Sequence, residues 1–356
     1  GSAPDELSQS HIVARDAAPG VNYMTKRLHT GARLPGTSEN LSPTFSDRMK
    51  PMEEMNEEYT ITPFRSGFVS VMGRPNVGKS TLINSLLGQK VAAVSPRPQT
   101  TRKRQMGILT LDAAQVVFID TPGVHQPRHK LGENMNQEAL DALGESDVIL
   151  WVVDASEAPT EEDDLLSASL AQLRRPVPTI LALNKVDLIT GEELDSRREA
   201  YLELAPLAQP IPVSATQGEN LDGLLEAVVE QLPEGPPFFP PDQITDLYER
   251  EIAADLIREA SLNILRDEVP HGIAIRIDQY QERNEEGAYI EGTVFVEKES
   301  HKGIVIGKGG SMLKKIGTAA RMEIERMSGR KVFLRLRVKV RKNWRDDESV
   351  LRYFGF

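Results

Sequence analysis

The stretch GFVSVMGRPNVGKSTLINSLL, residues 67–87, decides the fold of this chain. Its centre, GRPNVGKS, matches the pattern GxxxxGK[ST] and joins a strand-like apolar run to a helix-like amphipathic run. The glycines permit a tight nest of backbone N–H groups around phosphates, while Lys79 reaches the β and γ oxygens and the Ser80 hydroxyl binds Mg²⁺. The pattern predicts a nucleotide phosphate site formed by Gly73, Asn76, Val77, Gly78, Lys79, Ser80 and Thr81.

Short apolar runs alternate with amphipathic segments as far as residue 232. After GFVSVMG come the runs VVFID, VILWVVD, PTILALNK and PIPVSA, separated by helical segments such as NLDGLLEAVVEQL. Apolar runs interleaved with helices are typical of parallel strands that are buried on both faces. We therefore expect residues 67–235 to form an α/β domain with a largely parallel sheet.

Composition excludes several classes of protein. The chain has 356 residues, enough for about two domains. It has no cysteine, which excludes disulfides, thiolate metal sites and cysteine catalysis. Its longest apolar run, residues 148–155, is shorter than the roughly 18 residues that cross a bilayer. We expect a cytoplasmic protein, with peripheral contact with the inner membrane and an organellar location as less favoured alternatives.

Residues 1–66 are rich in Ser, Pro, Gly and charged residues and lack sustained periodicity, so we expect a disordered N-terminal extension. A transit peptide is the alternative. The first 50 residues contain six Lys and Arg against five Asp and Glu, whereas transit peptides are poor in acidic residues.

Two further motifs follow the phosphate loop in the order that a GTP site requires. In DTPG, Asp120 can contact Mg²⁺ through water, and the Gly123 N–H can contact a γ-phosphate. In NKVD, the Asp187 carboxylate can accept hydrogen bonds from N1–H and the exocyclic amine of guanine, and adenine has no donor at N1. The remaining predicted base-pocket residues are Lys185 across the base, Asn184 bracing the loop, and Ser214 and Ala215 of PVSA.

Together these motifs resemble the Era family of GTPases. The segment SPRPQTTRKRQ, residues 95–105, is similar to the switch I loop of that family with its Gln-Thr-Thr-Arg core. The resemblance implies that GTP or GDP is the bound nucleotide and that Thr101 closes on Mg²⁺ in the GTP state, with Thr100 the less favoured candidate. The implied metal ligands are thus Ser80, Thr101 and Asp120. Without GTP, a solvated basic loop describes the same segment.

Val124 stands where Ras-like GTPases carry the glutamine that orients the attacking water. An apolar side chain cannot do this, so we assign no catalytic residue and expect slow turnover. Asn76 is the residue type with which related GTPases hold K⁺ beside the phosphates, which predicts stimulation by K⁺. The alternative is that Asn76 only shapes the loop. We assign no catalytic role to Arg97, Arg102, His125, Arg128 or His129 and expect most of them to be solvated or to face RNA.

A Pro-rich segment separates this domain from a second one. PEGPPFFPP, residues 233–241, holds five prolines in nine residues, and we assign 236–241 as the linker. The pattern then predicts a long helix near 242–267, two strands (HGIAIRIDQY and AYIEGTVFVE), a helix-turn-helix and the strand KVFLRLRVKV. This αββααβ order favours a small α+β domain over residues 242–356 with its helices on one face of the sheet.

The loop GKGG, residues 307–310, joins the two helices of the helix-turn-helix. Its GxxG pattern resembles the loop of a type II KH domain, which clamps the backbone of about four single-stranded nucleotides. Residues 300–345 carry 14 Lys and Arg against 2 Asp and Glu, a net charge of +12, while the whole chain carries −11. The predicted RNA-binding residues are Lys302, Gly307, Lys308, Gly309, Gly310, Lys314 and Arg321. In the strand that follows, alternation puts Arg335, Arg337, Lys339 and Arg341 on one face as a general electrostatic footprint.

The expected fold class is therefore an α/β P-loop GTPase domain followed by a smaller α+β type II KH domain. The resemblance implies a GTP-hydrolysing switch that binds the 3′ end of small-subunit rRNA and assists biogenesis of the 30S ribosomal subunit. We expect a monomer with no obligate protein partner. Two alternatives are a GTPase that acts on another RNA and an RNA-binding protein whose nucleotide site is only structural.

Overall fold

The computed structural model describes residues 63–356 except 96, 98–99 and 285–286. The expected N-terminal extension falls on residues that lie outside this range, apart from its last four. Its expected end at residue 66 is wrong, because strand β1 begins at Arg65. Arg65 and Ser66 pair with Ala114 and Gln115 of strand β3, so both residues belong to the sheet.

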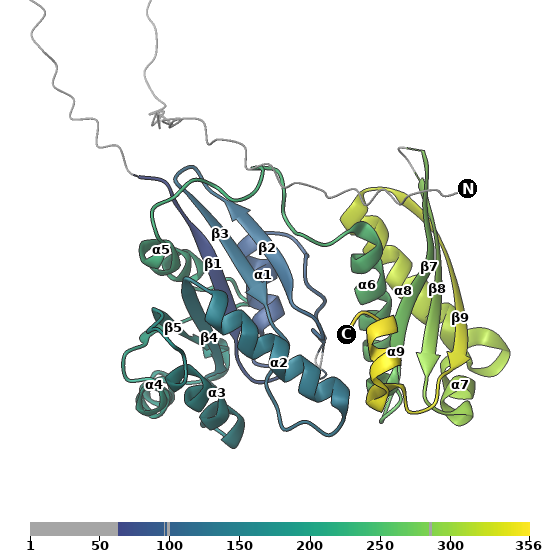
Figure 1. Ribbon diagram of the computed structural model, residues 1–356, viewed down its shortest axis with the longest axis horizontal. Helices are drawn as coiled ribbons and strands as arrows, with labels where there is room; N and C mark the ends of the chain where they lie inside the picture. The colour runs from purple at the N-terminus through teal and green to yellow at the C-terminus, as the bar shows by residue number, and fades with distance from the viewer. Residues whose placement is uncertain (1–62, 96, 98–99, 285–286) are drawn as a thin grey trace, which may run out of the picture. The chain divides into compact units, whose positions relative to one another are not determined.

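The first domain is a six-stranded sheet with the order β2-β3-β1-β4-β5-β6 (Figure 1). The strands are β1 (Arg65–Met72), β2 (Gln105–Thr110), β3 (Ala114–Asp120), β4 (Val148–Asp154), β5 (Thr179–Asn184) and β6 (Gln209–Pro212). All neighbours are parallel except β2 and β3. The expected parallel sheet is confirmed, but sequence analysis missed β2, whose short segment QMGILT is only half apolar.

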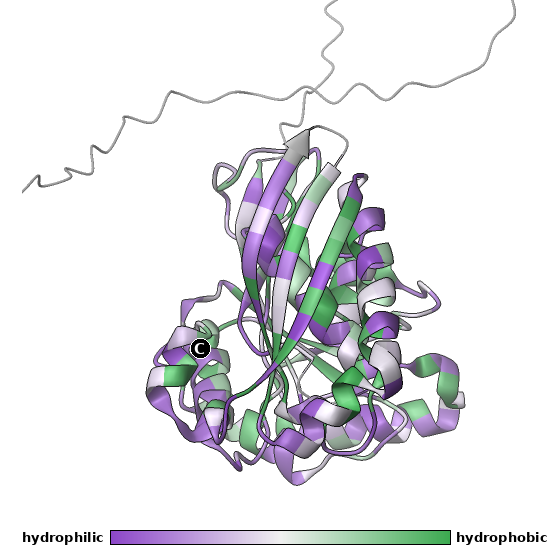
Figure 2. Ribbon diagram, turned by 90° about the vertical axis from the view of Figure 1, so that its right-hand side faces the viewer, coloured by the Kyte–Doolittle hydropathy of each residue, from purple (hydrophilic) through white to green (hydrophobic). Residues whose placement is uncertain are grey.

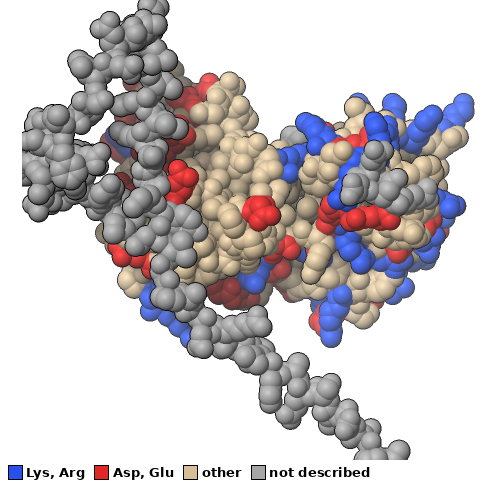
Figure 3. Space-filling model, turned by 90° about the horizontal axis from the view of Figure 1, so that it is seen from above, with Lys and Arg blue, Asp and Glu red and all other residues tan. Residues whose placement is uncertain are grey.

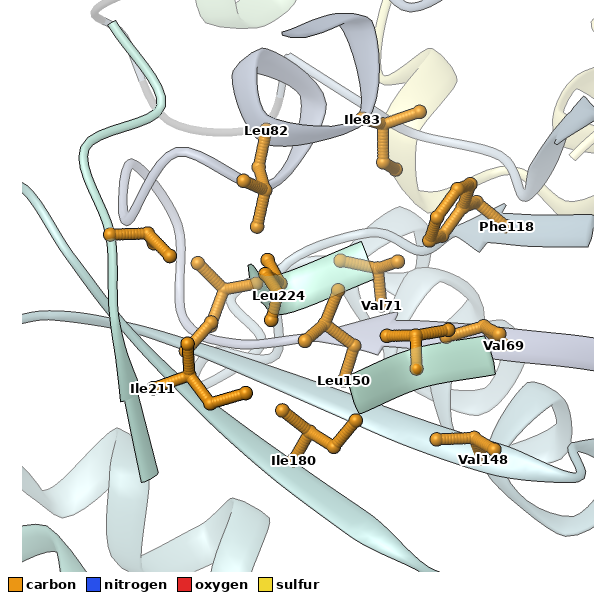
Figure 4. Packing of buried hydrophobic residues seen from close by; sticks show 14 of the residues in the cluster. Val69, Val71, Leu82, Ile83, Phe118, Val148, Leu150, Ile180, Ile211 and Leu224 are labelled. Atoms are coloured by element: carbon orange, nitrogen blue, oxygen red, sulfur yellow. The ribbon is translucent and has the colours of Figure 1, made fainter. Parts of the chain in front are cut away.

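Helices cover both faces of this sheet. They are α1 (Lys79–Leu87), α2 (Lys130–Glu145), α3 (Glu161–Ala171), α4 (Gly191–Leu204) and α5 (Leu221–Gln231). Residues of α1 and α5 share one core cluster with Val148, Leu150 and Val152 of β4, which Figure 4 shows in part. The alternate residues of β4, including Ile149 and Trp151, pack with residues of α2, α3 and α4. Strand β4 is fully buried because both of its faces meet helices.

The linker is fixed to the first domain. The Gln115 Oε1 atom accepts hydrogen bonds from the backbone N–H groups of Phe238 (2.7 Å) and Phe239 (2.9 Å). Farther along, the Ile108 N–H donates to the Ile244 carbonyl at 2.9 Å. The expected helix from 242 is therefore wrong at its start. Residues near 244 pair with β2, and helix α6 runs only over Glu249–Ile264.

The second domain has the predicted αββααβ order. After α6 come β7 (Ala274–Asn284), β8 (Gly287–Val296), α7 (Glu299–Ile306), α8 (Ser311–Ser328) and β9 (Lys331–Val340). β7 and β8 are antiparallel, whereas β8 and β9 are parallel, so β9 forms one edge of the sheet. The helices pack on one face of the sheet around a shared core. A short last helix, α9 (Glu348–Tyr353), was not predicted.

Candidate nucleotide site and RNA interface

A cavity of about 500 Å³ opens at the carboxyl ends of the parallel strands. Ligands of open α/β sheets bind at this edge, because the loops that follow the strands converge there. The predicted residues that line the cavity are Asn76, Gly78, Lys79, Ser80, Thr81, Thr101, Gly123, Asn184, Lys185, Asp187 and Ala215. Sequence analysis did not assign Pro75, Ala93, Val94, Ser95, Leu188 and Thr216, which also line it. Leu188 directly follows NKVD and Thr216 directly follows PVSA, and their position next to these motifs could have predicted that they line the cavity.

Four predicted residues do not line the cavity but support its walls. The Gly73 carbonyl accepts a hydrogen bond from Lys79, and a Cβ atom at Gly73 would lie 2.3 Å from the Val152 carbonyl oxygen. The Val77 side chain is buried in the core, so only its backbone faces the loop. Asp120 and Ser214 are buried as well, and they form hydrogen bonds with the lining side chains of Ser80, Thr101 and Asp187.

Three oxygen-bearing side chains converge at one corner. The Ser80 hydroxyl donates to Asp120 Oδ2 at 2.8 Å, and the Thr101 hydroxyl lies 3.0 Å from both the Ser80 hydroxyl and Asp120 Oδ2. Thr100 also lines the cavity, but its hydroxyl donates to the Arg97 carbonyl at 2.8 Å instead of to this cluster. The second carboxylate oxygen of Asp120 is buried with no hydrogen-bond partner among the described residues. A set of hydroxyl and carboxylate oxygens with one oxygen unsatisfied fits Mg²⁺ or its bound water.

Lys79 lies at the floor of the cavity. Its ammonium group donates to the carbonyls of Gly73 (2.9 Å) and Arg74 (3.0 Å). Burial lowers the pKa of Lys79 to about 8, although the negative charge of Asp120 acts in the opposite direction. An anionic ligand beside Lys79 would restore the charged form, because opposite charge stabilises the ammonium ion.

The base end of the cavity is braced by hydrogen bonds. Asn184 donates to the Val77 carbonyl at 2.8 Å and accepts from the Ala215 N–H at 3.0 Å, so one side chain ties three loops together. The Ser214 hydroxyl donates to Asp187 at 2.5 Å and holds that carboxylate in place. Lys185 forms an ion pair with Asp154. Sequence analysis missed Asp154, which sits opposite Asn184 in the register of β4 and β5.

Val124 points away from the cavity. Its side chain is 6% exposed and packs in the core cluster that contains Met72 and Trp151. Asn76, by contrast, lines the cavity and has a positive φ of 66°. Gly123 allows its loop to lie close to the backbone of Pro75, because a Cβ atom at this position would lie 2.8 Å from the Pro75 nitrogen.

The loop that carries Thr101 contacts the second domain on both sides. Arg102 is 3% exposed and donates to the carbonyls of Ile273 (2.7 Å) and His271 (3.0 Å). Arg258 of α6 donates to the Thr100 carbonyl. Arg102 is therefore an exception to the expectation that most of these basic residues and histidines are solvated or face RNA. Sequence cannot show which loop charges a second domain will cover. Gln99 of the same loop lies outside the described residues.

The GKGG loop turns between α7 and α8. Gly307, Gly309 and Gly310 have φ values of 73°, 61° and 80°, a region that other residues adopt only with strain. Next to the loop, a groove of about 340 Å³ lies between α8 and β9. The predicted residues Gly310, Lys314 and Arg321 line it, together with Leu313, Gly317, Thr318, Leu334, Arg335 and Leu336.

Lys302, Lys308 and the other loop glycines are outside that groove lining. Lys302 is half-exposed and lies 3.9 Å from Glu299, a long ion pair that leaves it available to other anions. Lys and Arg side chains are concentrated over the second domain in Figure 3. The predicted positive surface thus combines a groove with flanking cations.

Comparison with known proteins identifies the family. A family model described as 50S ribosome-binding GTPase matches residues 68–185, and one described as KH domain matches residues 268–345. GTPase Era of Heliobacterium modesticaldum is 47% identical over 292 residues, which is 82% of this chain and 97% of that protein. This chain belongs to the Era family of GTPases. GTPase Era of Geobacter metallireducens is 48% identical over 83% of this chain and 98% of its own length.

Solved Era structures match the same part of the chain. One is Era in complex with MgGDPNP and nucleotides 1506–1542 of 16S ribosomal RNA, with a TM-score of 0.77 and 39% identity over 82% of this chain and 99% of that one. Another, a point variant of Aquifex aeolicus Era bound to GDP·AlF4⁻, gives the same TM-score, identity and coverage. The predicted family and the fold of an α/β GTPase domain followed by a KH domain are confirmed. No helix of the residues that the structure describes is long and apolar enough to cross a membrane.

Proposed function

We propose that this Era-family GTPase is a GTP-driven switch that binds the 3′ end of small-subunit rRNA and assists assembly of the 30S subunit in the cytoplasm. One observation carries the proposal. The GKGG loop and its basic groove belong to a chain that aligns with 99% of an Era structure whose ligands are MgGDPNP and nucleotides 1506–1542 of 16S rRNA. The same alignment supports the nucleotide cavity as the GTP site.

In this proposal the phosphate loop from Gly73 to Thr81 holds the phosphates and Lys79 neutralises them. Ser80 and Thr101 ligate Mg²⁺, and Asp120 acts through a bound water. Asp187 reads guanine, Lys185 lies across the base, and Ser214 with Ala215 closes the pocket. Support comes from the convergence of Ser80, Thr101 and Asp120 within 3.0 Å of one another and from the Asn184 brace.

The attacking water is positioned by something other than Val124, whose side chain is in the core. We propose that K⁺ held by Asn76 supplies positive charge beside the β and γ phosphates, where it stabilises the charge that develops in the transition state. The test is the rate of phosphate release in KCl and in NaCl at equal ionic strength. Equal rates in the two salts would remove K⁺ from the proposal.

In the RNA half, the glycines 307, 309 and 310 let the phosphate backbone approach closely, and Lys302, Lys308, Lys314 and Arg321 pair with phosphates. The N-terminus of α8 begins directly after the loop and adds positive potential there. These contacts position the strand but carry no sequence information themselves.

The two halves are coupled through the loop that binds Mg²⁺ in this proposal. Thr101 lies between Thr100, whose carbonyl accepts from Arg258, and Arg102, which donates to His271 and Ile273. A change in the position of Thr101 on hydrolysis therefore acts directly on contacts with the KH domain. RNA affinities measured with GDP and with a GTP analogue test this coupling, and equal affinities would contradict it.

The main experiment is crosslinking of the GTP-analogue-bound protein to cellular RNA, followed by sequencing of the bound RNA. We expect recovery of the 3′ end of small-subunit rRNA, and a Lys308→Ala/Lys314→Ala double variant should recover less of it. Recovery of tRNA or mRNA without that 3′ end would favour a GTPase that acts on another RNA. Sedimentation of the free protein tests the expected monomer, and flotation with anionic vesicles tests peripheral membrane contact.

A further inference from the structure

An aromatic pair stands on the sheet of the KH domain, away from the GKGG loop. Tyr289 of β8 and Phe333 of β9 are direct neighbours in the strand register, and their rings are stacked with centroids 5.6 Å apart and an interplanar angle of 11°. Phe333 is 62% exposed. A single exposed aromatic is ordinary, but a stacked pair on an open sheet face presents a flat apolar platform.

The other end of this sheet face is covered. Phe295, six residues after Tyr289 on β8, is 8% exposed and packs against Phe354 with ring centroids 4.9 Å apart. Trp344, Val350 and Leu351 belong to the same cluster and bury the face at that end. Figure 2 looks onto the strands of this sheet, and their upper parts have no helix in front of them. Among the residues that the structure describes, one end of the face is covered, and no helix covers the Tyr289–Phe333 end.

Basic side chains flank the platform on the same face of β9. The exposed positions of this strand alternate, and they place Lys331, Arg335 and Lys339 on the side of Phe333. Arg335 is about 70% exposed, and its ion pair with Glu291 is long, at 3.5 Å. Arg337, in contrast, is held by Asp278 and Thr293. Aromatic rings between available cations match the chemistry of a single-stranded nucleic acid, whose bases stack and whose phosphates pair with cations.

The platform and the KH groove lie on opposite faces of the same edge strand, and Arg335 is common to both. β9 is an edge strand, and its Leu334 and Leu336 line the groove beside α8. Phe333 is the residue directly before Leu334, and Arg335 lies between the two leucines and also lines the groove. An RNA strand that leaves the groove and passes around the edge of β9 meets Phe333 on the other face of the sheet.

We propose that the RNA-binding surface continues over the edge strand β9 and that a further base of the bound single strand stacks on Phe333. Lys331 and Arg335 pair with the phosphates on either side of that base. The inference rests on the proposed function, since it requires single-stranded RNA in the KH groove. It adds a site beyond the roughly four nucleotides that a KH loop clamps. Stacking tolerates any base, so this site adds affinity for RNA without adding sequence specificity.

The test compares two RNAs from the 3′ end of small-subunit rRNA, one of about four nucleotides that fills the groove and one of about ten that also reaches β9. Phe333→Ala in the full chain should weaken binding of the longer RNA by about 5- to 150-fold and leave the shorter RNA unaffected. Phe333→Trp should retain wild-type affinity, because it keeps a stacking surface. Phe333→Leu should behave like Phe333→Ala, because it is apolar but lacks an aromatic face.

Direct evidence comes from longer RNAs that carry 2-aminopurine at successive positions. At one of these positions the 2-aminopurine fluorescence should be quenched by the wild-type protein and not by Phe333→Ala. Tyr248→Ala removes another exposed aromatic and should change neither affinity nor quenching. Unchanged affinity of each variant for the shorter RNA reports that the KH domain is folded.

Unchanged affinity of Phe333→Ala for the longer RNA, with no position quenched by wild type, would overturn the inference. Capture of a protein by this face with no effect on RNA would overturn it in favour of a protein-binding surface. If the wild type binds neither RNA, the proposed function itself fails. If it binds both equally and Lys308 and Lys314 carry all of the affinity, only the inference fails.

Discussion

In the nucleotide cavity most functional side chains are buried or bonded to one another, whereas on the KH domain most of them extend into solvent. Lys79, Asp120 and Asn184 are all buried, and each has its position fixed by neighbours. Among the residues that the structure describes, Lys302 and Arg335 of the KH domain have only long ion pairs. A buried site depends on every member, because an unpaired polar group costs free energy there. An exposed basic surface adds small, separable contributions.

Asp187→Asn gives the largest expected effect. It replaces an acceptor by an amide whose NH2 group faces the donors of guanine, so GTP affinity should fall by about 10⁴-fold, the loss typical of a site whose buried hydrogen bonds go unmade. Xanthosine triphosphate, which has a carbonyl in place of the amine, should bind better than GTP. Titration with both nucleotides is the measurement. Asp195→Asn, an exposed carboxylate on α4, is the matched control and should change nothing.

Arg102→Met tests whether loss of one buried contact between the domains has a large effect, as in the cavity, or a small one, as on the exposed basic surface. The change leaves the carbonyls of His271 and Ile273 without their donor, at a cost of about 1–3 kcal/mol in the free energy of unfolding. Thermal unfolding and the nucleotide dependence of RNA binding are the measurements. Arg104→Met removes an exposed ion pair with Glu145 and should cost less than about 1 kcal/mol. Equal losses for both variants would contradict the argument from burial.

The pH dependence of GTP binding tests the state of Lys79. Its pKa of about 8 in the free protein means that the ammonium group loses its proton above that pH. Phosphates favour the charged form, so binding above pH 8 must take up a proton. Affinity should then fall by up to about tenfold per pH unit as the pH rises. Calorimetry at pH 9 in two buffers with different ionisation enthalpies measures the uptake, and a value of zero would refute the shift.

Lys308→Ala and Lys314→Ala give the smallest expected effects and define the surface side of the comparison. Each should weaken RNA binding only severalfold and lower the slope of log affinity against log salt by about 0.7. The two effects should add in the double variant. Filter binding at several salt concentrations provides the data, with Arg198→Ala on the exposed face of α4 as the control. Losses of affinity as large as that of Asp187→Asn would show that binding in the groove depends on each side chain, as it does in the cavity.

Sequence patterns predicted that distant motifs line one cavity because each motif follows a buried strand. Parallel strands end at the same edge of the sheet, so Lys79, Asp120 and Asp187 had to meet even though they are far apart in the chain. β2 and the pairing of residues near 244 with it were missed, because a short edge pairing leaves little hydrophobic periodicity. The last helix, α9, was missed for the same reason of length.

The sequence by itself determined the two domains, their order, the nucleotide loops and the positive charge of the KH domain. These features depend on local spacing, periodicity and composition, which can be read directly from one sequence. Only the tertiary structure decided that Arg102 is buried against His271 and Ile273, that Val124 lies in the core, and that Phe333 stacks on Tyr289. Such contacts join residues distant in the chain, and burial depends on which surfaces the folded chain brings together.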